Sequence, residues 1–227
     1  KEKVLEAIKD PDCGYFYETS VENFEKIPGM PIAYWASEKI YKVFKNSDKI
    51  GNYYKSAGRN KTHNNGLYVR YYWEIDNNKL FNEWKPYDNG GDYRKYYGNR
   101  FYIVNWSKEA LNFYKSKGGL INLKNIESEG VVWSLITSSN SSFRIKKEYD
   151  VVSSASPTII AMDKLKNENY YILSFLNSKI TNRLLKMYNP TLNTTVSDIL
   201  NLPLLFSEIY KPEIDSLVEE NIKISKI

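Results

Sequence analysis

The pattern of apolar and polar residues predicts helices toward both ends of the chain. In residues 31–44 apolar side chains recur three and four positions apart, which is typical of a helix that packs one face on a core, and Pro31 suits its first turn. A shorter helix is expected near residues 3–8. Residues 10–30 contain two prolines and two glycines, which favour a connector.

The middle of the chain has the pattern of a sheet. Residues 67–75 alternate apolar and polar positions, which predicts a half-buried strand with Arg70 on its second face. Further strands are expected at residues 101–106, 131–137, 143–147 and 158–161. A short helix capped by Ser107 is expected after the first of these. The expected fold class is therefore α+β, a twisted mixed or antiparallel sheet with flanking helices.

After this sheet the helical spacing returns. An apolar stripe runs from Tyr171 to Leu185, and Pro190 is expected to end its helix. A last helix is expected after Pro212. These helices are expected to pack on a neighbouring domain.

Residue counts exclude several kinds of chemistry. Among the 227 residues, Cys13 is the only cysteine and His63 the only histidine, so disulfide frameworks and Cys/His metal sites are excluded. No apolar run approaches the roughly 18–20 residues that cross a bilayer, and residues 1–10 do not resemble a signal peptide. We therefore expect a cytoplasmic protein with no metal and no membrane partner.

Positive charge and tyrosine are concentrated in one segment. Residues 39–117 contain 16 Lys and Arg against 7 Asp and Glu, and 12 of the 20 tyrosines, whereas the whole chain has a net charge of +5. Basic side chains neutralise phosphates, and tyrosine rings contact sugars and bases. The segment indicates a nucleic-acid partner, with a tyrosine-rich sheet covered by solvated lysines as the alternative.

The motifs of a methyltransferase active site are absent from the sequence. Such a site needs an Asn/Asp-Pro-Pro-aromatic tetrapeptide that holds the flipped base, and residues 189–192 lack the second proline and the ring. Gly90-Gly91 and Gly118-Gly119 are isolated pairs, which are typical of turns rather than of a cofactor loop. Asp88 and Asp92 are interpreted as solvated or turn residues. We therefore expect no catalytic residue here, and an independent nuclease or hydrolase has no site to support it.

Three stretches resemble segments of a known family. Residues 23–35 read Asn-Phe-Glu-Lys-Ile-Pro-Gly-Met-Pro-Ile-Ala-Tyr-Trp, and residues 84–99 contain Gly-Gly, Arg-Lys and Tyr-Gly-Asn in a fixed order. The third is a set of segments that follow one another along the chain: Trp133-Ser134, residues 175–179, residues 189–193 and Leu202-Pro203. Together they resemble the C-terminal half of the adenine-specific DNA methyltransferases of BREX phage-defence systems, the PglX family. They are also similar to recognition domains of type I restriction specificity subunits.

The resemblance implies a sequence-specific DNA recognition domain of an N6-adenine methyltransferase in BREX-type defence or restriction-modification. It implies a connector from a missing N-terminal methyltransferase domain (residues 1–30), a target-recognition domain (residues 31–206) and a C-terminal helix (residues 207–227). The parent enzyme would bind S-adenosylmethionine and methylate DNA, and this fragment alone would bind no cofactor. Residues 59–65 depart from the family pattern Gly-x-x-Thr-Gly-Asp-Asn, which leaves the recognised DNA motif undetermined.

The candidate contacts to double-stranded DNA are assigned by residue type. Phosphate contacts are assigned to Lys55, Arg59, Lys61, Arg94, Lys95 and Arg100, and base-edge contacts to Asn64, Asn65, Arg70, Asn89, Ser138, Ser139, Asn140 and Arg144. The basic residues are expected to form one contiguous face. For each position the alternative is a surface charge or a turn residue.

A protein-interaction module is the second interpretation. Interfaces between proteins also favour Tyr, Trp and Arg, so the tyrosine-rich surface would bind another defence-complex subunit or a phage protein. Salt separates the two interpretations, because DNA binding weakens steeply with salt through counterion release.

Overall fold

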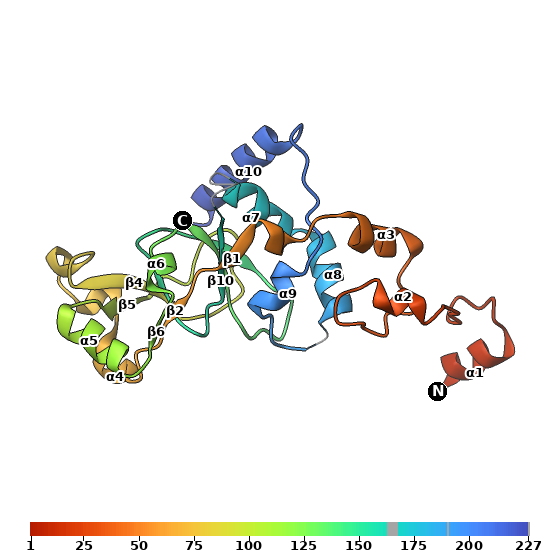
Figure 1. Ribbon diagram of the computed structural model, residues 1–227, viewed down its shortest axis with the longest axis horizontal. Helices are drawn as coiled ribbons and strands as arrows, with labels where there is room; N and C mark the ends of the chain where they lie inside the picture. The colour runs from red at the N-terminus through yellow and green to blue at the C-terminus, as the bar shows by residue number, and fades with distance from the viewer. Residues whose placement is uncertain (163–167, 190, 227) are drawn as a thin grey trace.

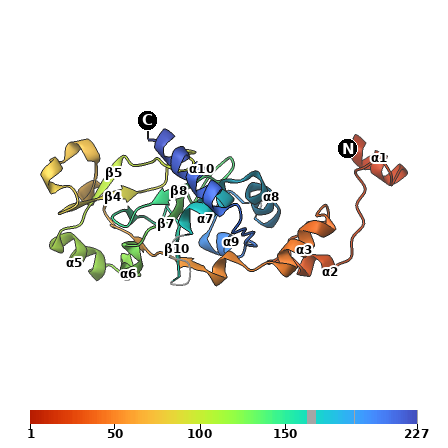
Figure 2. The same cartoon turned by 90° about the horizontal axis from the view of Figure 1, so that it is seen from above.

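A computed structural model describes residues 1–162, 168–189 and 191–226. Helices lie toward both ends of the chain and small sheets lie between them, which confirms the expected α+β class with antiparallel and mixed sheets (Figure 1). The N-terminal helices extend from one end of the molecule, and both views place α1 far from the sheets (Figure 2).

The first sheet has four antiparallel strands in the order β1-β10-β7-β8. Its strands are β1 (Tyr54–Ser56), β10 (Thr158–Ala161), β7 (Gly130–Trp133) and β8 (Phe143–Lys146). The helices beside it are α7 (Asn169–Asn177), α8 (Lys179–Tyr188), α9 (Val196–Leu200) and α10 (Lys211–Ile224). Trp133 and Phe143 lie in one buried cluster with Leu173 and Leu176 of α7 and Val218 of α10. The C-terminal helix therefore shares the core of this sheet.

The second sheet is mixed and has the strand order β3-β5-β4-β9. Its strands are β3 (Val69–Tyr71), β5 (Tyr102–Asn105), β4 (Trp84–Asp88) and β9 (Val151–Val152), and only β4 and β9 are parallel. A two-stranded ribbon pairs β2 (Arg59–Asn60) with β6 (Leu120–Ile121). Short helices beside these strands are α4 (Asn65–Tyr68), α5 (Lys108–Ser116), α6 (Leu123–Ile126), η2 (Tyr72–Glu74) and η3 (Asn77–Lys79). Tyr87, Val104 and Tyr114 are buried in a second core beside this sheet.

The N-terminal region packs only in part. Its helices are α1 (Glu2–Lys9), α2 (Glu22–Glu25), α3 (Glu38–Asn46) and η1 (Ile50–Asn52). No residue of α1 is buried. Ile27, Ala33 and Tyr41 are buried with Met187 of α8, and the Tyr41 hydroxyl donates to the Ala33 carbonyl at 3.0 Å. Residues 27–46 are thereby attached to the body of the protein.

An interior ion pair joins the two sheets. Arg144 of β8 is fully buried, and its Nη2 lies 3.1 Å from Oδ2 of Asp88 at the end of β4. The Ser156 hydroxyl donates to Asp88 Oδ1 at 2.6 Å and accepts from the Gly90 amide at 2.6 Å. Asp88 is therefore a structural anchor, which corrects its interpretation as a solvated residue. Its Oδ1 also accepts from the Gly90 amide at 3.2 Å, as expected of a turn residue.

A buried lysine lies close to this junction. Lys146 is 1% exposed, and its Nζ donates to the carbonyls of Ile126 (2.7 Å), Ser128 (2.7 Å) and Lys147 (3.0 Å). Burial disfavours the ammonium and lowers the pKa of Lys146 to about 8, although Asp150 acts in the opposite direction.

Most predicted elements are present, with informative exceptions. The strands at residues 101–106, 143–147 and 158–161 are confirmed, as is the last helix, and the Ser107 hydroxyl accepts from the Ala110 amide at 3.3 Å. The helix expected from Pro31 begins at Glu38. The stripe after Asn167 forms two helices, α7 and α8, which meet at Ser178. Pro190 lies outside the described residues.

The strand predicted at residues 67–75 is wrong over most of its length. The Asn64 side chain accepts from the Leu67 amide at 3.1 Å and caps a helical turn, and Glu74 accepts from the Tyr71 amide at 2.7 Å. These side-chain bonds compete with the sheet ladder, so only Val69–Tyr71 is strand and Trp73 is 60% exposed.

We predict that Asp88→Ala lowers the free energy of unfolding by about 3–5 kcal/mol, because it leaves the Arg144 guanidinium buried without a counter-charge. Urea denaturation measures the change. Glu219→Ala, which removes an exposed partner of Lys223, serves as the control and should cost about 0–1 kcal/mol. Equal effects of the two substitutions would contradict a structural role for the interior pair.

We predict that Lys146 makes stability depend on pH above neutrality. The unfolded lysine, with a pKa of 10.5, keeps its proton between pH 8 and 10.5, where the folded lysine has lost it. The unfolded state then binds more protons, so stability rises with pH in this window, by at most about 1.4 kcal/mol per pH unit. Urea denaturation of the wild type against Lys146→Met isolates this term from tyrosine ionisation. A difference that stays constant from pH 7 to 10 would refute it.

Candidate nucleic-acid interface

Three adjoining hollows lie where the sheets meet. The first, of about 410 Å³, lies between β1, β2, β10 and α9. The second, of about 340 Å³, is lined by residues 60–63 and by Asn65. The third, of about 440 Å³, lies beside α4, β3 and β5. Ser153 and Ser154 line the first two, and Asn65 and Asn89 line the last two. We call this series of hollows the junction trough.

Five of the predicted site residues line the junction trough. Arg59 lines the first hollow, Lys61 lines the second, and Arg70 lines the third. Asn65 and Asn89 line both of the last two. Glu74 is the only carboxylate among the described residues that line the three hollows, so the lining is positively charged.

The polar side chains of the third hollow are held in place by local contacts. Arg70 Nη1 donates to the Gly66 and Val69 carbonyls, each at 2.7 Å. The Thr62 hydroxyl donates to the Asn65 side-chain oxygen, which leaves the Asn65 amide nitrogen for another acceptor. Asn64 is occupied in capping α4. Arg70 and Asn65 are therefore positioned before any ligand arrives.

Two exposed aromatic rings and one half-buried ring stack beside the third hollow. The Tyr71 and Trp73 rings are 4.5 Å apart and nearly parallel at 7°, and the Tyr102 ring lies 5.1 Å from the Tyr71 ring at an angle of 27°. Sequence reasoning found the richness in tyrosine but not this stack, because it expected Tyr71 and Trp73 to face the core. The serine run at 153–156 was missed in the same way, although its hydroxyls line the first and second hollows.

Other predicted residues lie elsewhere or are engaged in the interior. The structure corrects the assignment of Arg144 to base edges, because Arg144 is fully buried against Asp88. Arg100 pairs with Asp150, and although burial alone would lower its pKa, the hydrogen bond and charge of Asp150 raise it above the ordinary value. Lys95 Nζ donates to the Asn177 carbonyl at 2.7 Å.

The remaining predicted residues are exposed but do not line the trough. Lys55 lies on β1, and Arg94 lies in the segment between β4 and β5. The exposed residues Ser138, Ser139 and Asn140 follow β7, and the last two line a separate hollow of about 40 Å³. Of the residues expected to form one basic face, Arg59 and Lys61 line the trough, whereas Lys55, Arg94 and Arg100 do not.

Two further features bear on the chemistry. Among residues 1–162, 168–189 and 191–226, no three His, Cys, Asp or Glu side chains are grouped as metal ligands would be. Within these same ranges no helix is both long enough and apolar enough to cross a membrane.

Comparison with known proteins places the chain among relatives of adenine-specific methyltransferases, and no protein-family model matches it. It is similar to the adenine-specific methyltransferase PglX of Lacticaseibacillus casei (strain Zhang), with 32% identity over 242 residues that cover 98% of this chain and 20% of the relative. It is also similar to the adenine-specific methyltransferase BrxX of Escherichia coli O9:H4 (strain HS), with 27% identity over 217 residues that cover 93% and 18%.

The chain is therefore homologous to PglX and BrxX over nearly its whole length, which confirms the resemblance to PglX methyltransferases. It spans about a fifth of the length of these curated relatives.

Proposed function

We propose that this chain recognises double-stranded DNA within a larger N6-adenine-specific methyltransferase of the phage-defence type, acting in the cytoplasm. The observation that carries the proposal is the junction trough. Its described lining contains Arg59, Lys61 and Arg70 but only one carboxylate, that of Glu74. Homology to two adenine-specific methyltransferases supports the same partner. Methyl transfer from S-adenosylmethionine belongs to the parent enzyme in this proposal.

The trough has side chains suited to holding DNA phosphates and others suited to recognising base edges. Lys61 is exposed and forms no ion pair among the described residues, as suits a phosphate contact. Arg70 uses only Nη1 for the backbone, so its other guanidinium nitrogens remain for a guanine edge. Asn65 and Asn89 offer amides of the kind that bind adenine edges.

We propose that the chain has three parts. Residues 1–30 form a connector from the catalytic domain, residues 31–206 form the recognition domain and residues 207–227 form a terminal helix. The exposed face of α1 supports contact with another domain. Val218 and Ile222 pack in the core of the first sheet, so the terminal helix would move with the recognition domain.

Protein binding is a second candidate, favoured by the exposed rings of Tyr71 and Trp73, which stack beside the half-buried ring of Tyr102. Rigid aromatic rings on a surface are common centres of protein interfaces. Another subunit of the defence system would be the partner. Binding through this stack would depend weakly on salt, unlike DNA binding.

We predict that substitutions in the trough of the full-length natural protein fall into two classes. Lys61→Ala should weaken binding to all duplexes and reduce the salt slope by about one unit, because one phosphate contact is lost. Arg70→Ala or Asn65→Ala should relax the methylated motif by roughly 1–3 kcal/mol per lost base contact. Anisotropy titrations and single-molecule sequencing of modified genomes provide the measurements.

Lys45→Ala on α3 is the charge-matched control for Lys61→Ala, because Lys45 is exposed and lines none of the three hollows. If Arg70→Ala and Asn65→Ala both leave the motif unchanged in an active enzyme, the reading surface lies elsewhere. The exposed loop at residues 138–140 is then the better candidate.

We predict that residues 1–227 alone bind no S-adenosylmethionine and methylate no DNA, because the base-holding tetrapeptide and the glycine-rich loop are absent from the sequence. Isothermal titration calorimetry of the folded chain measures cofactor binding, and the full-length natural protein is the positive control. Micromolar binding to residues 1–227 would refute the prediction.

A further inference from the structure

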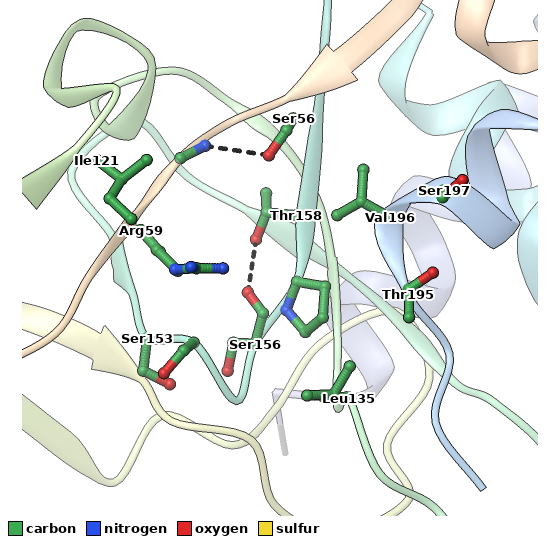
Figure 3. A pocket seen from close by; sticks show the side chains of 13 residues that line it. Ser56, Arg59, Ile121, Leu135, Ser153, Ser156, Thr158, Thr195, Val196 and Ser197 are labelled. Carbon is green, nitrogen blue, oxygen red and sulfur yellow. Dashed lines mark hydrogen bonds between the residues drawn. The ribbon is translucent and has the colours of Figure 1, made fainter.

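The first hollow of the junction trough has the features of a ligand pocket. Figure 3 shows the Arg59 side chain extending from β2 into this pocket, among side chains from β1, β6, β10 and α9. Its volume of about 410 Å³ falls within the roughly 300–1,000 Å³ typical of small-molecule sites. The pocket is therefore larger than a single ion requires.

Arg59 has no counter-charge in this pocket. Among the described residues its side chain makes no hydrogen bond and no ion pair, and none of the residues lining the pocket is Asp or Glu. This contrasts with Arg100 and Arg144, which are both paired with carboxylates. A guanidinium keeps its charge at every physiological pH, so the pocket attracts an anion.

Hydroxyl groups in the pocket have hydrogens to donate to that anion. The Ser56 hydroxyl accepts from the Gly58 amide at 3.5 Å, and the Ser197 hydroxyl accepts from Asn201 Nδ2 at 3.3 Å. Each acts only as an acceptor in these contacts and retains its own O–H. The Ser156 hydroxyl is already committed to Asp88. Two hydroxyl donors and one guanidinium in the lining of the same pocket suit the oxygens of a phosphate group.

The rest of the lining is apolar. Ile121, Leu135, Pro157 and Val196 line the pocket together with the hydroxyl groups. A ligand with a charged group and a less polar part therefore matches it better than inorganic phosphate does. Ser153 and Ser154 connect this pocket to the second hollow, where Lys61 offers a further positive charge.

We propose that this pocket binds one nucleotide, with its phosphate on the Arg59 guanidinium and its sugar or base against the apolar side chains. Where the nucleotide belongs to a DNA strand, the inference rests on the proposed function, and the pocket fixes the position of the strand rather than reading its sequence. A free mononucleotide offers the same chemistry from a second source.

The test uses the full-length natural protein and its variants Arg59→Ala and Arg59→Lys. Arg183→Ala is the matched control, because Arg183 is an exposed arginine of α8 that does not line the pocket. Calorimetry measures binding of deoxyadenosine monophosphate. Anisotropy measures binding of a duplex in which single phosphates are replaced by neutral methylphosphonates.

For a DNA source we expect Arg59→Ala to weaken duplex binding by about 10- to 100-fold with the methylated motif unchanged. One methylphosphonate position should weaken the wild type and have no further effect on Arg59→Ala. Arg59→Lys should retain part of the affinity, because the charge remains. For a free nucleotide we expect the monophosphate to bind and Arg59→Ala to abolish its binding.

The outcomes separate the pocket from the proposed function. If the wild type binds duplex DNA and Arg59→Ala behaves like Arg183→Ala toward both ligands, the pocket proposal is overturned and DNA recognition stands. If the wild type binds the monophosphate through Arg59 but binds no duplex, the pocket stands and the proposed function fails. Binding of neither ligand by the wild type overturns both.

Discussion

The charge of Arg144 lies inside the protein, and its need for a partner determines how the two sheets meet. An arginine without water or a carboxylate is costly in an apolar interior. Asp88 supplies the carboxylate from the other sheet, at 3.1 Å. The same carboxylate accepts from Ser156, and the Asp88 carbonyl accepts from the Ser153 amide at 2.9 Å. The serine loop along the junction trough is thereby held by the residue that neutralises Arg144.

The turn after Asp88 depends on the same contact. Gly90 has a φ of +75° and donates its amide to Ser156, and Gly91 follows with a φ of +126°. A Cβ on Gly91 would lie 2.9 Å from Cγ of Asn99 and would require that side chain to move. Glycine is therefore needed where the chain turns away from the ion pair, and Asn89, between Asp88 and this turn, is placed at the trough.

Local signals in the sequence predicted the elements whose stability is local. The Ser107 cap was found because capping acts over a few residues, and the strand at residues 158–161 was found because turn-forming residues separate it from the strands before it. The strand at residues 67–75 failed because Asn64 and Glu74 bind backbone amides that a ladder would have used. The composition of the basic segment pointed to Arg59 and Lys61. It did not predict that Ser153 would lie beside them, because that proximity depends on strand pairing between distant segments.

The position of unpaired charge is a better guide to a DNA-binding surface than its amount. Residues 39–117 have nine more basic than acidic residues, but Arg100 is neutralised by Asp150 and Lys85 by Glu127. Folding thus removes part of the local excess through acids from residues beyond 117. Arg59 and Lys61 remain without carboxylate partners among the described residues, and they line hollows that share Ser153 and Ser154. A phosphate at either position would gain a charge contact without first breaking an ion pair, which is why the trough, rather than the whole basic segment, is the surface to test.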